Sequence, residues 1–366
     1  RLLIPLVASE DGKVTLRNII SRLLWLCRWA TRLCASSYVA GLFILWLACR
    51  YIGEENITLT FALYLPPTGW ALPLAVIVPL ALVFDWKSLI PAAAGAAIVA
   101  LGFCGWQSHS PQTPAPNESA LTVLTFNRGE SSGSLQPFKN LTKPDVLIFQ
   151  EAANRADRYA NSPGYEEMIY GENIGEFSLV SRFPITSKEL ISNGKTVMAA
   201  RFTIEWNKQS VVLYSMHLPS PRHSLQALER GAFLWGVLGQ FGKWADKRKS
   251  YEDWWHSQIS LAETMLSRAE AETLPCIVAG DSNAPAPGYI HHLLTRRLTD
   301  SHEAAGSGCG LSFPGTTRNP LSLGGPWLRL DKILSNQHWR PLWSQVEAAR
   351  PSQHRAVAAA FALPTK

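Results

Sequence analysis

Residues 275–283, P-C-I-V-A-G-D-S-N, decide the fold of this chain. The apolar run from Cys276 to Ala279, closed by Gly280, predicts a short buried strand. Asp281 and Asn283 follow it directly, and on a backbone that stays extended their side chains would face the same side. A carboxylate and an amide converging there can take a proton from a water molecule and orient it. A strand that ends in an Asx turn is the structural alternative.

The composition indicates a protein with membrane-embedded length. The chain has 366 residues, of which 47% are hydrophobic and only 17% are charged. With a mean hydropathy of +0.01, it is more apolar than an ordinary soluble enzyme. The formal net charge is +6 at pH 7, but part of this excess lies near the N-terminus, so the total says little about the substrate.

The six cysteines form no C-x-x-C pair, which excludes the common zinc-binding spacings. Cys276 lies in the predicted strand and Cys309 in a glycine-rich loop. An oxidising compartment would permit a disulfide between them, although a buried free thiol is the expected state.

Three apolar runs in the first third of the chain predict a membrane anchor. They cover about residues 36–52, 68–85 and 89–106, each near the roughly 17–25 residues that a spanning helix needs. Pro73 and Pro79 interrupt the second run, for which a re-entrant or buried helix is the alternative. The alternative for the third run is an alanine-rich helix of a soluble core.

Basic residues predict the orientation of this anchor. Residues 1–35 carry several arginines and should stay in the cytoplasm, whereas the next loop carries Glu54 and Glu55 without a Lys or Arg. Three spans then place everything after residue 106 on the periplasmic or extracellular side. Residues 107–119 are rich in Pro and Ser and predict a linker, which leaves residues 120–366 as a separate domain.

Short apolar or β-branched runs after the linker predict strands, each with one polar residue beside it. The runs lie near residues 120–126, 145–149, 177–180, 198–204, 210–216, 275–280, 328–334 and 356–363. The polar residues are Asn127, Glu151, His217, Asp281 with Asn283, Asp331 within its strand, and His354. Each alone has a structural explanation, such as a core histidine for His217. Together they predict a sheet that presents catalytic groups at one rim.

These stretches resemble the endonuclease/exonuclease/phosphatase superfamily. The matching segments are T-F-N (Asn127), D-V-L-I-F-Q-E (Glu151), S-R-F-P-I (181–185), M-H-L (His217), G-D-S-N (Asp281, Asn283), R-L-D-K-I (Asp331) and S-Q-H-R (His354). They follow the family's order from residue 121 to about residue 363. The resemblance implies an α/β protein, a four-layered α/β/β/α sandwich with two central mixed sheets. Here it would follow a bundle of about three transmembrane helices, as in bacterial membrane-anchored members.

The resemblance also implies a divalent cofactor and a base. Glu151 would bind Mg²⁺ or Mn²⁺ with Asn127 beside it, since a hard cation prefers oxygen ligands. Asp281 would be the general base, and Asn283 would orient the water or the phosphate.

Histidines have the remaining implied roles. His354 would donate a hydrogen bond to a phosphate oxygen while Asp331 holds its other ring nitrogen, and His217 would contact the phosphate. The cation and the imidazolium together would stabilise charge on the phosphoryl oxygens.

Three residues depart from the family pattern. Gln353 replaces a usual Asp, Ser282 a bulky residue, and Lys332 a usual His or Tyr. The expected function is a membrane-anchored phosphodiesterase or phosphatase acting outside the cytoplasm. The alternative, which Gln353 supports, is a catalytically weak or inactive membrane protein that binds a phosphate ligand.

A basic and aromatic strip at residues 241–255 concerns the substrate. Its basic residues lie near Trp244, Trp254 and Trp255. It would suit a nucleic-acid backbone with stacked bases, or an anionic bilayer; a solvated helix face is the structural alternative. The expected partners are therefore the lipid bilayer and a phosphate ester, either nucleic acid or phospholipid. No protein partner is indicated.

Overall fold

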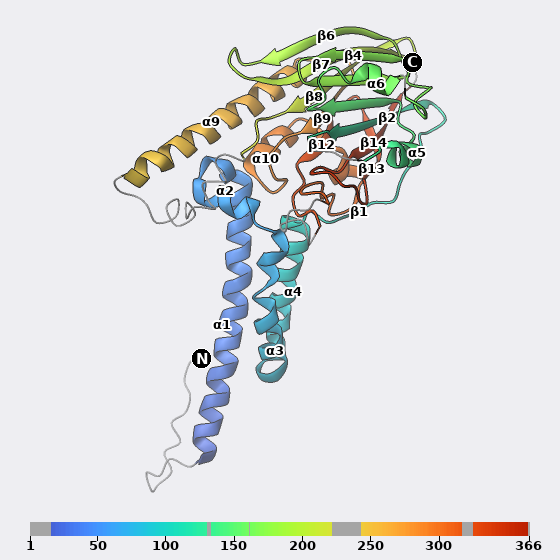
Figure 1. Ribbon diagram of the computed structural model, residues 1–366. Coiled ribbons are helices and arrows are strands. Elements are labelled where there is room, and N and C mark those ends of the chain that lie inside the picture. The colour runs from blue at the N-terminus through green and yellow to red at the C-terminus, as the bar shows by residue number, and fades with distance from the viewer. Residues whose placement is uncertain (1–15, 130–132, 161, 222–242, 317–324, 365–366) are drawn as a thin grey trace. The chain divides into compact units, whose positions relative to one another are not determined.

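The computed structural model describes the chain apart from residues 1–15, 130–132, 161, 222–242, 317–324 and 365–366 (Figure 1). The chain divides into two compact units. The first comprises Arg1–Leu45 and Thr68–Val99, and the second comprises Trp46–Pro67 and Ala100–Lys366. All the candidate site residues lie in the second unit.

Apolar helices make up the first unit and the segments that leave it. They are α1 (Leu16–Tyr51), η2 (Pro67–Ala71), α3 (Leu74–Phe84), η3 (Trp86–Ser88), α4 (Leu89–Ala97) and η4 (Ile98–Phe103). Among the described residues, three helical stretches are long and apolar enough to cross a membrane: Arg17–Tyr51, Pro67–Phe84 and Trp86–Phe103. They overlap the three apolar runs, and the first is longer than expected because residues 17–35 are helical too.

The outward face of these helices is apolar, whereas a charged pair lies between them. Large apolar side chains are exposed on them, among them Leu72, Val76, Leu82, Val83 and Ile90. Such a surface is costly in water and suits a hydrocarbon environment. Between the helices, the Arg32 guanidinium donates to both carboxylate oxygens of Asp85, at 2.9 and 3.0 Å. This pair ties α1 to the turn between α3 and α4.

Two six-stranded sheets form the frame of the second unit, in the orders β10-β12-β9-β8-β7-β6 and β13-β14-β2-β3-β5-β4. The first contains β10 (Thr299–Asp300), β12 (Asp331–Ser335), β9 (Cys276–Asp281), β8 (Gln209–His217), β7 (Val197–Trp206) and β6 (Ile185–Ser192). The second contains β13 (Arg340–Val346), β14 (Val357–Pro364), β2 (Glu118–Asn127), β3 (Val146–Gln150), β5 (Phe177–Ser181) and β4 (Tyr170–Ile174). Both are mixed, because β8–β9 and β2–β3 are parallel pairs among antiparallel ones.

Three apolar cores arrange these sheets and helices in four layers. Phe202 and Ile277 belong to the core between the sheets. Helices α9 (Lys243–Glu270) and α10 (Tyr289–Thr295) pack on the outer face of the first sheet, and α5 (Gln136–Thr142) and α6 (Ala156–Ala160) on that of the second (Figure 1). Strand alternation produces both faces: in β3, Val146 and Ile148 point inward and Leu147 and Phe149 outward. The expected α/β/β/α sandwich is confirmed.

The chain between the first two apolar helices also packs on the sandwich, through η1 (Gly53–Glu55) and α2 (Ile57–Tyr64). Buried Glu54 accepts hydrogen bonds from the backbone N–H groups of Tyr289, at 2.7 Å, and Ile290, at 3.2 Å, in the first turn of α10. Burial raises the pKa of Glu54 to about 7, although these hydrogen bonds oppose the shift. Tyr64 packs on Trp255 of α9, with ring centroids 5.9 Å apart. A segment expected only as a loop between spans is thus part of the sandwich unit.

Candidate active site

The polar residues singled out in the sequence meet at one edge of the two sheets. The strand register sets His217, Asp281 and Asp331 abreast on β8, β9 and β12. On the other sheet, Asn127 ends β2 and Glu151 directly follows β3, its parallel neighbour. The ends of strands from both sheets therefore bring these side chains to one rim.

Asp281 lies at the centre of this rim and is only 1% exposed. Its Oδ2 accepts a hydrogen bond from Nδ2 of Asn127 at 2.9 Å, across from the other sheet. The same oxygen lies 3.6 Å from Nε2 of His354 and 3.9 Å from Nε2 of His217. Burial raises the pKa of Asp281, and the nearby Asp331 acts in the same direction, whereas both imidazoles oppose the shift.

A close approach of two strands sets the position of Asp281. The preceding residue, Gly280, has φ of +144°, and a Cβ atom there would lie 2.0 Å from the carbonyl oxygen of Met216. Only glycine fits such a contact, so the glycine of the G-D-S-N stretch lets β9 reach β8 just before Asp281.

The backbone does not stay extended after Asp281, and the expectation that it carries Asn283 onto the same face is wrong. Asn283 has φ of +46°, and its N–H donates to Oδ1 of Asp281 at 2.8 Å. This is an Asx turn, the structural alternative for the stretch. The side-chain amide of Asn283 donates to the carbonyl oxygen of Leu218 at 2.8 Å. The backbone carbonyl oxygen of Asn283 accepts from the hydroxyl of Tyr64 at 2.6 Å.

His354 is held between two carboxylates. Its Nδ1 lies 2.9 Å from Oδ2 of Asp331, and the ring of Phe313 packs on it with centroids 4.9 Å apart. Burial would lower the pKa of His354, but Asp331 and Asp281 outweigh it and raise the pKa to about 9. The imidazole is therefore charged at neutral pH and donates from Nδ1 to Asp331.

His217 contacts the carboxylate of Glu176, a residue that the sequence did not indicate. Its Nδ1 lies 2.9 Å from Oε1 of Glu176, in the turn between β4 and β5. Burial opposes the charged form, yet Glu176, Asp281 and Glu151 together raise the pKa of His217. Glu176 is one acid in a turn without a motif, so no sequence signal distinguished it.

Glu151 offers the accessible carboxylate of the rim, with a side chain 44% exposed. Its Oε1 accepts a hydrogen bond from Nδ2 of Asn127 at 3.2 Å. The amide oxygen of Asn127 already accepts from the N–H of Gly129 at 2.9 Å. Donor atoms of Asp281, Asp331 and His354 also lie within 4.8 Å of one another, but one of the three donors is an imidazole nitrogen, whereas a hard cation prefers oxygen ligands. A hard cation therefore fits the Glu151 side of the rim.

Two of the unusual residues contact each other. The Nζ of Lys332 donates to Oγ of Ser282 and to the carbonyl oxygen of Ala284, each at 2.5 Å. Burial lowers the pKa of Lys332 to about 8. The Ser282 hydroxyl also donates to the carbonyl of Leu330 at 2.8 Å. Ser282 and Lys332 therefore form a matched pair that fixes the turn after Asp281.

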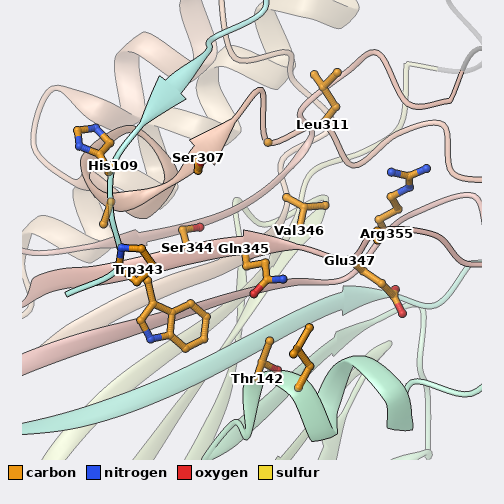
Figure 2. A pocket seen from close by; sticks show the side chains of 15 residues that line it. His109, Thr142, Ser307, Leu311, Trp343, Ser344, Gln345, Val346, Glu347 and Arg355 are labelled. Carbon is orange, nitrogen blue, oxygen red and sulfur yellow. The ribbon is translucent and has the colours of Figure 1, made fainter. Parts of the chain in front are cut away.

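A cavity of about 640 Å³ opens beside β13, and no residue of the catalytic rim lines it (Figure 2). Arg355 and Glu347 lie at one end, and Trp343 and His109 lie at the other (Figure 2). Because Arg355 directly follows His354, the first end lies next to the rim.

Buried carboxylates and imidazoles gathered at the rim of a two-sheet sandwich are a constellation suited to phosphate ester hydrolysis. The Endonuclease/Exonuclease/phosphatase family model matches residues 135–354. The chain belongs to this family of hydrolases.

Several solved structures are similar to this chain at low identity. A humanized D. rerio TDP2 is 15% identical over 66% of this chain and 98% of that chain, with a TM-score of 0.45. D. rerio TDP2 complexed with a single-strand DNA product is 14% identical over 66% and 99%, also at 0.45. The endonuclease/exonuclease/phosphatase from Bacteroides vulgatus is 14% identical over 67% and 99%, at 0.47. No curated protein matches the chain.

We expect Asp331→Asn to lower the pKa of His354 from about 9 toward or below the ordinary value of about 6.5. The variant removes the nearest carboxylate and leaves burial, which favours the neutral ring. A pH titration of the His354 ring resonance by NMR, on metal-free protein, measures this.

The same shift predicts a stability effect. Because the folded-state pKa is raised, protonation of His354 stabilises the fold fully below about pH 6.5, and the contribution is lost as the pH rises through about 9. Asp331→Asn should remove this loss, whereas Asp253→Asn on the exposed side of α9 should keep it. An unchanged His354 pKa in Asp331→Asn would contradict the assigned contact.

Proposed function

We propose that the protein is a membrane-anchored, divalent-metal-dependent phosphodiesterase or phosphatase that acts on the extracytoplasmic side. The convergence of Asp281, His354 and Asp331 in one buried cluster, beside an accessible Glu151, carries the proposal. The apolar helices and the arginine-rich leader support the anchor and its orientation.

Asp281 would accept the proton of the attacking water. A base works best when its pKa lies near the working pH, and burial moves the pKa of Asp281 upward from its ordinary value. The Nδ2 hydrogen bond from Asn127 and the two nearby imidazoles favour the ionised carboxylate that accepts the proton. Asn283 would act by holding the turn that follows, since its N–H donates to Asp281 and its side-chain amide donates to the carbonyl oxygen of Leu218.

His354 would donate from Nε2 to a phosphoryl oxygen. Asp331 occupies Nδ1 and keeps the ring charged, so the proton on Nε2 remains available for the substrate. His217, whose pKa Glu176 helps to raise against the effect of burial, would contact the phosphate from β8. Donors set in place before the reaction stabilise charge that develops on the phosphoryl group.

Glu151 would hold the divalent cation, Mg²⁺ or Mn²⁺, with Asn127 fixing its carboxylate. When bound, such a cation supplies positive charge beside the phosphoryl oxygens. Gln353, where the family usually has an Asp, leaves this chain with one carboxylate fewer for that purpose.

A phospholipid or head-group ester is the favoured substrate class, and nucleic acid is the second candidate. The anchor keeps the unit near a lipid surface. One ring of the basic and aromatic strip is unavailable for base stacking, because Trp255 is 3% exposed and packs on Tyr64. The start of the strip, residues 241–242, lies outside the described residues. Hydrolysis should be compared on mixed phospholipid vesicles, single-stranded DNA and inositol phosphates. A salt titration then separates the two candidates, because nucleic-acid binding falls steeply with salt.

We expect Asp281→Asn to lower hydrolysis of the best substrate by about 10²–10⁴-fold, the usual contribution of a general base. Asp253→Asn, the same change on the exposed side of α9, should retain wild-type activity. Initial rates with Mg²⁺ in detergent-solubilised full-length protein measure both. Equal activity in Asp281→Asn would contradict the assignment.

A phosphate ligand recovered intact from wild-type protein after long incubation with metal would favour the non-enzymatic alternative.

We expect Glu151→Gln to raise the Mg²⁺ concentration at half-maximal activity by roughly 10–100-fold, because the amide keeps the shape but loses the charge. Chelation should abolish wild-type activity, and added Mg²⁺ or Mn²⁺ should restore it. Glu172→Gln, an exposed acid of β4, is the matched control. Activity that persists in chelator would contradict the metal requirement.

We expect Tyr64→Phe to lower kcat about fivefold with little change in KM, since one hydrogen bond contributes about 1 kcal/mol. The hydroxyl holds the carbonyl oxygen of Asn283, and its loss frees the turn without touching the substrate. Tyr170→Phe, on β4, is the control. Rates measured well below the thermal midpoint of each variant would separate positioning from instability, and an unchanged kcat would contradict the role.

A further inference from the structure

Two cysteines about two hundred residues apart in the sequence lie together in the second unit. Strand β1 (Gln107–Ser108) pairs antiparallel with β11 (Ser307–Gly308), with Gln107 opposite Gly308. Beyond this ladder, the residues before β1 run beside those after β11. Cys104 and Cys309 flank this ladder as free cysteines, and their thiols interact there.

The backbone on both sides holds this contact in place. His109 donates from its N–H to the carbonyl oxygen of Gly306 at 3.1 Å, and Trp106 donates to that of Ala100 at 2.9 Å. Gly105 has φ of +64°, so the chain turns sharply between Cys104 and the strand. The two thiols therefore belong to an ordered junction between η4 and the loop after α11 (Ser301–Ala305).

The chemistry of the pair favours oxidation. The thiol of Cys104 lowers the pKa of Cys309 to about 7, although burial opposes the shift. A thiolate is the form that attacks a disulfide. Both side chains are partly exposed, so a small oxidant can reach them, whereas Cys276 is fully buried in the core against α9.

We propose that Cys104 and Cys309 form a disulfide bond when the protein meets an oxidising disulfide. The Cys309 thiolate attacks one sulfur of the oxidant, breaks its S–S bond and releases the first thiolate. The Cys104 thiol then loses its proton to solvent, attacks the Cys309 sulfur of the mixed disulfide and releases the second. Two protein thiols are oxidised to one disulfide, and one disulfide of the oxidant is reduced to two thiols.

The bond would clip the chain that follows the third apolar helix to a loop of the sandwich. The partner of Cys309 also differs from the one considered in the sequence, since Cys276 is completely buried in the core against α9. The proposal does not rest on the proposed hydrolysis, so its outcome is independent of the activity measurements.

The test uses the reduced full-length chain in detergent, treated with oxidised glutathione and then alkylated and mapped by peptide mass spectrometry. We expect one linked peptide pair that contains Cys104 and Cys309, with alkylation at both positions falling at least about tenfold. In Cys104→Ser the linked pair should vanish and Cys309 should carry a glutathione adduct. Cys34→Ser, an exposed position of α1, should leave the bond intact.

Two results would overturn the proposal: full alkylation of Cys104 and Cys309 after glutathione treatment of the wild-type chain, or a bond from Cys309 to another cysteine. Cys276 reports the folded state in the same sample, because it should react with the alkylating agent only after unfolding. The wild-type measurement stands even where a serine variant folds poorly.

Discussion

A buried carboxylate, Asp281, is the constraint on which the candidate site depends. Taking an ionised carboxylate out of water costs several kcal/mol unless charges and hydrogen-bond donors surround it. Here the donor, Asn127, ends a strand of the second sheet, the His217 imidazole ends a strand of the first, and the His354 imidazole comes from the loop between β13 and β14. The two sheets must therefore meet closely at this edge, and the same neighbours that make the burial tolerable are those a phosphate ester would encounter.

Apolar packing brings the sheets into that register. Alternating residues of β2, β3, β7 and β9 fill the space between the sheets, which fixes the face of each strand down to its end. At the rim the apolar layer gives way to polar pairs that cross between the sheets. The side-chain amide of Gln150 donates to the hydroxyl of Ser215 at 2.9 Å. Gln150 directly precedes Glu151, and Ser215 lies two residues before His217. A register shift of one residue would send these side chains to the opposite faces.

The sequence predicted the rim because polar residues interrupt apolar strands in a fixed order, and strand periodicity is a strong signal. The sequence also indicates α9, because Ile259, Ala262, Leu266 and Ala269 recur at helical spacing and all four face the core. It missed β6, whose side chains are mostly exposed and carry no apolar pattern. Glu176 and Tyr64 were missed for another reason: their contacts with His217 and Asn283 are made only by the tertiary fold.

Tyr64 and Glu54 extend the sandwich unit into the segment between the first two apolar helices. Both lie between the first two apolar helices, yet Tyr64 holds the turn after Asp281 and Glu54 caps α10. A chain that began at the linker, residue 107, would leave the carbonyl of Asn283 and the first N–H groups of α10 without these partners. Unpaired buried polar groups cost about 1–3 kcal/mol each. The site is therefore completed by residues 46–67, a segment far from the rest of the sandwich unit in the sequence that belongs to this unit in the fold.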